Sequence, residues 1–324
     1  MGDSALRLDR VDRQIIHALG IDGRAPFSRI ATVLGVSEQT IRRRYTRIVE
    51  AGVARVVALP RPRAEDFGQL LRLHVQPGSA LTLAKALARR EDVAWVRVAA
   101  AGAEVICGVR AASPEHRDGL ILDQLPRTGR VTGISVLALL HKFATPGRPD
   151  WTGFADPLDE AQQDDLDTRR TDEPAPTDAI DQRIIAALSD DARRPTSKIA
   201  VDTGLPETTV RRRLDALLRT GGVTLDLDVD HAALGHPVTG NLYLSVEPAG
   251  LAQAGQTLTR QAPMLFVAAT SGPWNVCAAV AFPTPAAFYE YLVGPLTQTP
   301  GIQAMESSIN TLYIKGARTP RTPR

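Results

Sequence analysis

Cysteine is scarce in this sequence, since only Cys107 and Cys277 occur among 324 residues. Two cysteines cannot build a disulfide framework, and both stand in apolar, strand-like stretches that favour buried thiols. No Cys or His spacing fits a zinc site, and neither a Gly-rich phosphate loop nor a nucleophile elbow is present. We therefore expect no catalytic residue, no bound metal and no cofactor.

Long apolar runs and a strong charge of one sign are also missing. No run is long enough to cross a bilayer, and the first residues are too polar for a signal peptide, so we expect a cytoplasmic protein without a membrane partner. The formal net charge is only +2. Any affinity for nucleic acid must therefore come from a local cluster of Lys and Arg. The length and the 44% of hydrophobic residues predict at least two domains.

A long internal repeat organises the chain. The stretch from Asp12, DRQIIHALGIDGRAPFSRIATVLGVSEQTIRRR, aligns without a gap with the stretch from Asp181, DQRIIAALSDDARRPTSKIAVDTGLPETTVRRR. Further on, Val75–Pro77 corresponds to Val246–Pro248, so the chain consists of two copies of one module. An acidic, Pro-rich stretch separates the copies and is predicted to be a poorly ordered linker. A solvated spacer is favoured there over an acidic mask for basic helices.

The first part of each copy predicts three short helices. In the first copy, Asp9 is a suitable N-cap for one helix, and the next covers about residues 27–34. Gly35 supplies a tight turn, and Ser37 caps the third helix. The helical spacing predicts a buried stripe on the third helix made of Ile41, Tyr45 and Ile48.

The third helix of each copy, called the recognition helix below, turns a polar face to solvent. Arg can fork onto guanine edges or phosphates, Gln can bridge adenine, and Thr can meet a thymine methyl. The candidate DNA-binding residues are Ser37, Gln39, Thr40, Arg42, Arg43 and Arg47 in the first copy and Thr208, Thr209, Arg211 and Arg212 in the second. Arg43 and Arg212 are predicted to be the central contacts. A module that only joins subunits, with these arginines solvated, is the alternative.

The two recognition helices differ in sequence. Ala216 stands where the first copy has Arg47, and Pro206 replaces the Ser37 cap. Proline suits the first turn of a helix because its missing N–H has no intrahelical partner there. We therefore expect two unlike DNA-binding surfaces and an asymmetric operator.

The second part of each copy shows the order βαββαβ, with strands at LLRLHVQ and EVICGVR in the first copy and at NLYLSVE and WNVCAAVAF in the second. Such a unit folds into a four-stranded antiparallel sheet with both helices on one face. The other face is apolar and needs a partner. This predicts sheet-to-sheet pairing.

The order of these parts and the string LGVSEQTIRRRYTRIVEAGV resemble the Lrp/AsnC (feast/famine) family of transcription regulators, here in a tandem two-module form. The fold class implied is α+β, with two tandem modules, each a winged helix-turn-helix followed by a ferredoxin-like βαββαβ domain. The resemblance implies double-stranded DNA and an amino-acid-like effector as ligands. It also implies a homo-oligomer formed through the ferredoxin-like sheets.

The expected domains follow from this order. They are helix-turn-helix domains at 1–60 and 177–228, ferredoxin-like effector and dimerisation domains at 65–144 and 236–315, an acidic linker at 145–176 and a disordered basic tail at 316–324.

In this family the effector site lies near the turn between the second and third strands, where an aromatic residue and an acid follow a glycine. The residues at the two turns are Gly102 and Glu104 in the first copy and Gly272, Trp274 and Asn275 in the second. The first copy lacks the aromatic residue, and Asn275 replaces the acid that would meet a ligand ammonium. Both glycines are equally well explained as hairpin-turn residues.

A siroheme decarboxylase-like enzyme is the alternative, because such enzymes resemble the same architecture. That chemistry needs His, Tyr or Arg side chains that converge on a tetrapyrrole. The histidines, among them His74 and His141, do not recur between the copies, and no such cluster is visible in the sequence. The regulator is therefore favoured over the enzyme.

Overall fold

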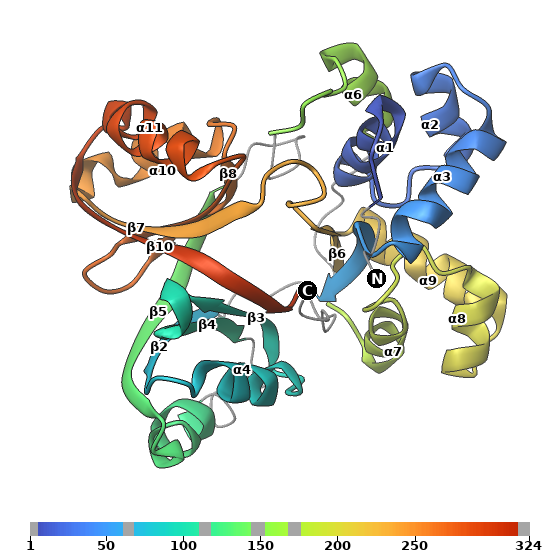
Figure 1. Ribbon diagram of the computed structural model, residues 1–324. Helices are drawn as coiled ribbons and strands as arrows, with labels where there is room; N and C mark the ends of the chain where they lie inside the picture. Colours follow the sequence, from blue (N-terminus) through green and yellow to red (C-terminus); the bar gives the residue numbers. More distant parts are fainter. Residues whose placement is uncertain (1–5, 61–67, 110–117, 144–152, 168–175, 317–324) are drawn as a thin grey trace, which may run out of the picture. The chain divides into compact units, whose positions relative to one another are not determined.

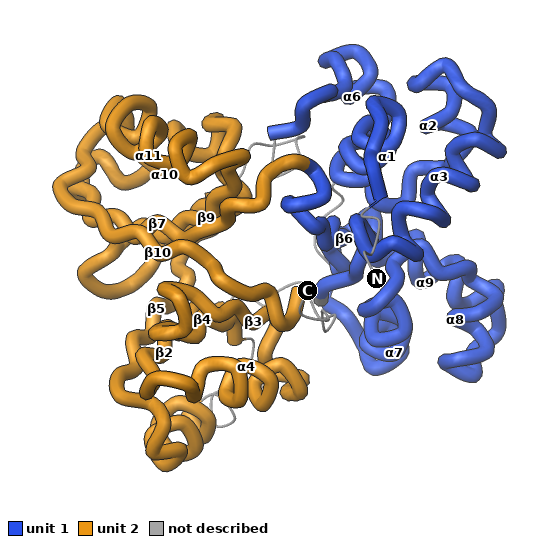
Figure 2. Tube along the Cα trace, viewed as in Figure 1, with its two compact units in different colours: residues 1–61, 146–149, 153–234 blue, residues 62–145, 150–152, 235–324 orange. Residues whose placement is uncertain are grey.

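The computed structural model describes residues 6–60, 68–109, 118–143, 153–167 and 176–316. They form two compact units, each built from both copies of the repeat (Figure 2). Unit 1 holds the two helix-turn-helix regions, and unit 2 holds the two βαββαβ regions. No helix among the described residues is long and apolar enough to cross a membrane. The predicted basic tail lies almost wholly outside the described residues.

Unit 1 contains two three-helix groups, each followed by one strand (Figure 1). The first group comprises α1 (Arg10–Ile21), α2 (Phe27–Leu34), α3 (Glu38–Glu50) and β1 (Ala54–Pro60). The second comprises α7 (Ala179–Ala187), α8 (Thr196–Thr203), α9 (Glu207–Arg219) and β6 (Val223–Val229). The helices predicted for the first copy are confirmed, and the buried stripe includes Ile41 and Ile48, both fully buried.

Local capping explains where these helices begin and end. Asp9 caps α1 through a capping box with Asp12, as predicted for the cap. Gly35 ends α2 in the left-handed conformation, which only glycine adopts at no steric cost. The Ser37 hydroxyl accepts a hydrogen bond from the Thr40 N–H at 3.1 Å and so caps α3. These contacts span three residues or fewer, which makes them visible in the sequence.

The strands β1 and β6 pair with each other in an antiparallel ribbon. The family resemblance implied a wing for each helix-turn-helix, and each contributes a single strand to one shared wing. Two equivalent arginines reinforce the contact between the two helix-turn-helix groups, which is called the joint below. Arg193 donates to the carbonyls of Gly23 (2.8 Å) and Ala25 (3.0 Å), and Arg24 donates to the carbonyl of Ala192. The two helix-turn-helix groups are therefore held together within one chain.

Part of the acidic linker is folded, so the expectation of poor order is wrong for residues 153–167. This segment forms helix α6 (Glu160–Leu166), which packs on α1 and α2 (Figure 1). Leu158 and Leu166 are buried, the Leu158 N–H donates to Nδ1 of His17 at 3.0 Å, and Phe154 stacks on the His17 ring. Two buried leucines among the acids supply the apolar contact that outweighs the charge of the segment.

Unit 2 contains the two predicted βαββαβ regions. The first comprises β2 (Gln69–Val75), α4 (Ala80–Ala88), β3 (Val93–Ala99), β4 (Glu104–Val109), a π-helical turn (Gly119–Gln124) and β5 (Val131–Phe143). The second comprises β7 (Val238–Val246), α10 (Leu251–Thr259), β8 (Met264–Thr270), β9 (Val276–Phe282), α11 (Pro285–Val293) and β10 (Ile302–Lys315). Both have the ferredoxin-like strand order expected from the sequence.

The two sheets close on each other into one eight-stranded barrel in the order β10-β3-β4-β2-β5-β8-β9-β7. The long strands β5 and β10 make this possible, since β5 pairs with both β2 and β8, and β10 pairs with both β7 and β3. Each sheet packs its helices on a hydrophobic core of its own, and a further core fills the space between the two sheets. Its residues include Leu70, Ile106, Leu137, Tyr243 and Cys277.

The predicted sheet-to-sheet pairing therefore occurs inside one chain. The expectation that a second copy would bind through these sheets needs correction, because each apolar sheet face already meets the other sheet of the same chain. Because both sheets belong to one chain, each has a high effective concentration near the other. This favours pairing within the chain over pairing with a second copy.

Candidate nucleic-acid interface and ligand pocket

An exposed arginine stands at the same central position of each recognition helix. Arg43 on α3 and Arg212 on α9 occupy equivalent positions in the repeat, and both side chains are exposed. Neither has a hydrogen-bond or ion-pair partner among the residues that the structure describes. Their guanidinium groups are thus open to an outside ligand, as the sequence predicted.

The neighbouring arginines are partly engaged along their own helices. Arg42 pairs with Glu38 at 2.8 Å, and Arg211 pairs with Glu207 at 3.3 Å. In each pair the two side chains are exposed and lie one helical turn apart. Such pairs contribute only about 0.3–0.5 kcal/mol to the stability of a helix. They can exchange for phosphate contacts at small cost. Gln39 and Thr208 are exposed on the same faces, whereas Thr40 and Thr209 are half-buried.

Ser37 and Arg47 are engaged within the first helix-turn-helix. The Ser37 hydroxyl lies 2.9 Å from Oγ1 of Thr40, in addition to its capping bond. The Arg47 guanidinium donates to the buried carboxylate of Asp12 at 2.6 Å, beside Arg44 at 2.9 Å. Arg47 therefore links α3 to α1 in this structure, and a contact from Arg47 to DNA stays a prediction that requires this ion pair to open.

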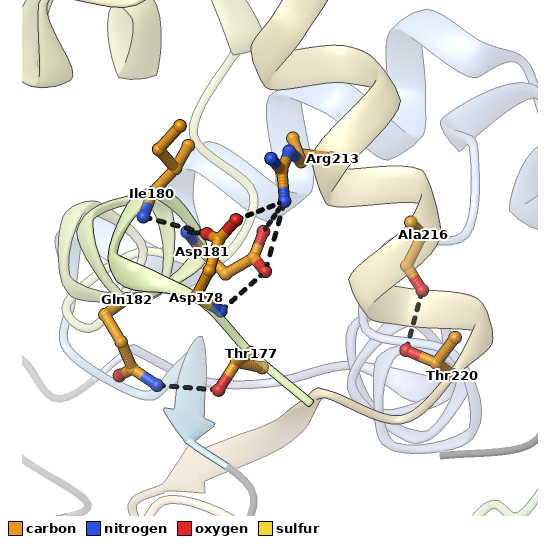
Figure 3. A network of polar contacts seen from close by, with 8 residues as sticks. All are labelled: Thr177, Asp178, Ile180, Asp181, Gln182, Arg213, Ala216 and Thr220. Atoms are coloured by element: carbon orange, nitrogen blue, oxygen red, sulfur yellow. Dashed lines mark hydrogen bonds and ion pairs between the residues drawn. The ribbon is translucent and has the colours of Figure 1, made fainter. Parts of the chain in front are cut away.

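The second copy repeats half of this arrangement (Figure 3). Arg213, the equivalent of Arg44, bonds both Asp178 and Asp181, while Ala216 at the Arg47 position adds no charge. The hydrogen bond from the Asp181 backbone N–H lowers the pKa of Asp178 most, and the hydrogen bond and charge of Arg213 lower it further. The link between capping-box acids and recognition helix is thus common to both copies, and the second arginine is specific to the first.

A pocket of about 370 Å³ lies in unit 2 beside the β8–β9 turn. Gly272 and Trp274, two of the five predicted effector residues, line it. Asn275 is engaged elsewhere, because its side-chain amide bonds both the N–H (2.8 Å) and the carbonyl (2.7 Å) of Val246. Its structural role explains why an amide, with a donor and an acceptor, stands at this position.

The other two predicted effector residues are not among those that line this pocket. Gly102 takes part in the β3–β4 turn with a φ of +93°. Glu104 is buried and accepts hydrogen bonds from Nε of Arg72 at 2.6 Å and from the Ser308 hydroxyl at 3.1 Å. Its carboxylate is therefore already paired within the protein.

The sequence analysis missed several polar residues of the pocket. Arg72 and His74 from β2, Ser135 from β5 and Glu306 from β10 line it together. Arg72 also stacks on the ring of Tyr243, with the guanidinium carbon 3.9 Å from the ring centroid. Arg72 and His74 thus share one pocket lining, which the sequence did not predict, whereas Tyr243 is fully buried and does not line the pocket. Residues 72 and 306 are too distant in sequence for any local pattern to connect them.

Ion pairing determines the protonation states of Arg72 and Glu306. Burial alone would lower the pKa of Arg72, but hydrogen bonds to Glu306 and Glu104 raise it above the ordinary value. The same hydrogen bond from Arg72 lowers the pKa of Glu306. Arg72 and Glu306 are therefore both charged at neutral pH.

Comparison with known proteins supports the fold and the helix-turn-helix assignment. Residues 8–48 and 178–218 each match the AsnC-type helix-turn-helix domain. An uncharacterized HTH-type transcriptional regulator of Pyrococcus furiosus is 28% identical over 144 residues, which cover 42% of this chain and 95% of that protein. The HTH-type transcriptional regulator FL11 of Pyrococcus abyssi is 29% identical over 143 residues, which cover 43% of this chain and 94% of the relative.

One solved structure matches nearly the whole chain. The siroheme decarboxylase NirDL superposes with a TM-score of 0.62 at 12% identity, covering 95% of this chain and 92% of that one. At this identity the likeness concerns the fold alone. Both tandem modules are thus part of an architecture that occurs elsewhere.

Proposed function

We propose that this chain, which carries two AsnC-type helix-turn-helix domains, is a sequence-specific DNA-binding transcription regulator. The observation that carries the proposal is that Arg43 and Arg212 are exposed and have no ion-pair partner in the part of the chain that the structure describes. Both stand at the same position of recognition helices that one β-ribbon holds in a single unit. Paired helix-turn-helix units place such helices in successive major grooves, where arginine forks onto guanine.

The two half-sites of the operator are expected to differ. The α3 surface offers Gln39, Thr46 and Arg47 where α9 offers Thr208, Asp215 and Ala216. Gln bridges adenine better than Thr does, and an exposed Asp repels phosphate. The operator proposed here is therefore an asymmetric sequence with two unlike halves.

The pocket in unit 2 is proposed to bind the effector, with Gly272 and Trp274 in its wall. Its volume is near the lower end of the range for small-molecule sites, which suits an amino-acid-sized molecule. Gly102, Glu104 and Asn275 are not part of the proposed contact set, because Glu104 and Asn275 are bonded to other protein groups.

Location and assembly complete the proposal. A regulator of this kind works where DNA lies, so we keep the cytoplasmic location expected from the sequence. A homo-oligomer remains a proposal as well, now through surfaces other than the apolar sheet faces. Sedimentation of the purified chain measures it directly.

The experiment that tests the function is selection of bound sequences from random DNA, followed by single variants. We expect one enriched motif with two unlike halves. Arg43→Ala and Arg212→Ala should each weaken binding to that motif by about 1–3 kcal/mol, each at its own half. Arg89→Ala, an exposed arginine in unit 2, is the matched control. Full affinity in both recognition-helix variants contradicts the proposal.

A siroheme decarboxylase-like activity is the second candidate, favoured by the fold of NirDL and by the presence of Arg72 and His74 in one pocket lining. The charges argue against it. Arg72 is already paired with two carboxylates, and a tetrapyrrole that carries several acidic side chains would meet unfavourable charge there. A Soret band that shifts when an iron tetrapyrrole is added to the protein would favour the enzyme.

A further inference from the structure

Two carboxylates, those of Glu306 and Glu104, pair with Arg72 at the pocket beside the β8–β9 turn. Resting on the pocket's proposed role as the effector site, we propose that its ligand is a small organic amine with an apolar body. Glu306 would hold the ammonium group, and the described residues that line the pocket include no Lys or Arg besides the paired Arg72 to hold a ligand carboxylate. An amine is thus expected to bind more tightly than the amino acid that carries the same side chain.

Arg72 and Glu306 line the pocket, and the buried Glu104, which does not line it, is bonded to Arg72. Arg72 lies between two carboxylates, with Nε 2.6 Å from Glu104 and Nη1 3.1 Å from Glu306, and a second bond joins Nη2 to Glu306. One positive and two negative charges leave this cluster with one negative charge. In a partly desolvated site such a charge attracts a cation and repels an anion.

Arg72 is not available to a ligand. Its side chain is only 6% exposed, it forks onto Glu306, and its flat face covers the Tyr243 ring. A ligand carboxylate could reach the guanidinium only by displacing Glu306, which would then lose both of its bonds to Arg72. Displacing a charge-assisted, bidentate pair is costly.

Glu306, by contrast, faces outward. Its side chain is 39% exposed and lines the pocket, so the carboxylate can accept further hydrogen bonds beyond those from Arg72. His74 and Ser135 line the same pocket, and a neutral imidazole and a hydroxyl can each accept a hydrogen bond. An ammonium group has three donors, which match this set.

The other residues that line the pocket are mostly apolar. Leu137, Pro273 and Trp274 line it, and the Trp274 ring is half-buried against the core between the sheets. An indole face attracts both an aliphatic chain and a cation. The ligand is therefore expected to have one cationic end and one apolar end.

Calorimetric titration of the full chain at pH 8, where histidine side chains are generally neutral, tests this ligand class. Two matched sets keep the apolar body constant: 2-phenylethylamine, phenylalanine and 3-phenylpropionate, and 3-methylbutylamine, leucine and 4-methylpentanoate. In at least one set the amine should bind at least tenfold more tightly than the amino acid, and the acid should not bind. Glu306→Gln should weaken amine binding at least tenfold, whereas Glu290→Gln, an exposed carboxylate on α11, should leave it unchanged.

Three results would overturn the inference: an amino acid or acid that binds more tightly than its amine, no binding by either amine, or unchanged amine affinity in Glu306→Gln. If that variant fails to fold, the ranking of the ligands on the unchanged protein decides alone. The DNA measurements on Arg43→Ala and Arg212→Ala need no ligand. Failure of the amine inference is therefore separable from failure of the regulator proposal.

Discussion

Removing Arg193 should loosen the joint between the two helix-turn-helix groups more than removing its counterpart Arg24. Arg193 donates to two carbonyls and lies over two aromatic rings of the first copy, with its guanidinium carbon 4.3 Å from the Phe27 centroid and 5.4 Å from that of Tyr45. Arg24 donates to one carbonyl, that of Ala192. The second copy has no aromatic pair to receive Arg24, because Thr196 and Leu214 occupy the equivalent positions.

The magnitude follows from these contacts. A hydrogen bond from a charged donor contributes about 1.5 kcal/mol, and a partly buried cation–π contact adds about 1 kcal/mol. Two hydrogen bonds and the nearer cation–π contact give a cost of about 4 kcal/mol for Arg193→Ala in the pairing of the two groups, and one hydrogen bond gives about 1.5 kcal/mol for Arg24→Ala. A difference of about 2.5 kcal/mol corresponds to roughly a seventyfold difference in the opening of the joint.

Hydrogen–deuterium exchange of the β1 and β6 amides measures this opening, because these strands pair only across the joint. Arg193→Lys is a useful third variant, since it keeps the charge but loses the fork. Equal exchange in Arg193→Ala and Arg24→Ala would refute the role given to the aromatic pair. Unchanged exchange in both would refute the joint itself.

Two further predictions concern unit 1. Burial raises the pKa of Tyr45 to about 12. The folded protein thus keeps Tyr45 protonated while Tyr45 of the unfolded chain ionises above pH 10, so the free energy of unfolding should fall between pH 10 and 12. Tyr45→Phe should reduce this fall in urea titrations. An equal fall in both proteins would show that Tyr45 does not cause it. His17→Ala leaves the buried Leu158 N–H without its acceptor, at a cost of about 1–3 kcal/mol. Amide exchange in α6 should therefore rise at least several-fold while exchange in α7 stays the same, and protection of α6 that persists would show that His17 does not hold it.

Local signals made the helix-turn-helix groups predictable. The Asp9 and Ser37 caps and the Gly35 turn each act within about three residues, so the sequence alone located α1, α2 and α3. The alternation and order of the strands likewise predicted both βαββαβ regions and the pairing of their apolar faces. The repeat itself predicted the equivalence of Arg43 and Arg212.

Contacts between distant parts of the chain were not predictable in this way. Arg47 was assigned to the solvent face from helical spacing, yet its guanidinium reaches Asp12 on another helix. The many acids of the linker predicted poor order, although two of its leucines, Leu158 and Leu166, are buried and hold α6 in place. The ligand pocket depends on Arg72 meeting Glu306, which only the closure of the barrel brings together.

The shared ribbon of β1 and β6 also bears on how such a protein can change over generations. In a pair of identical subunits every substitution appears twice, once on each side of the two-fold axis. Here the partner strands are encoded separately, so a substitution alters one side and leaves the other as it was. One recognition helix can acquire a new base preference while its neighbour retains the old one, and an arginine such as Arg193 can have an aromatic pair that its counterpart Arg24 lacks.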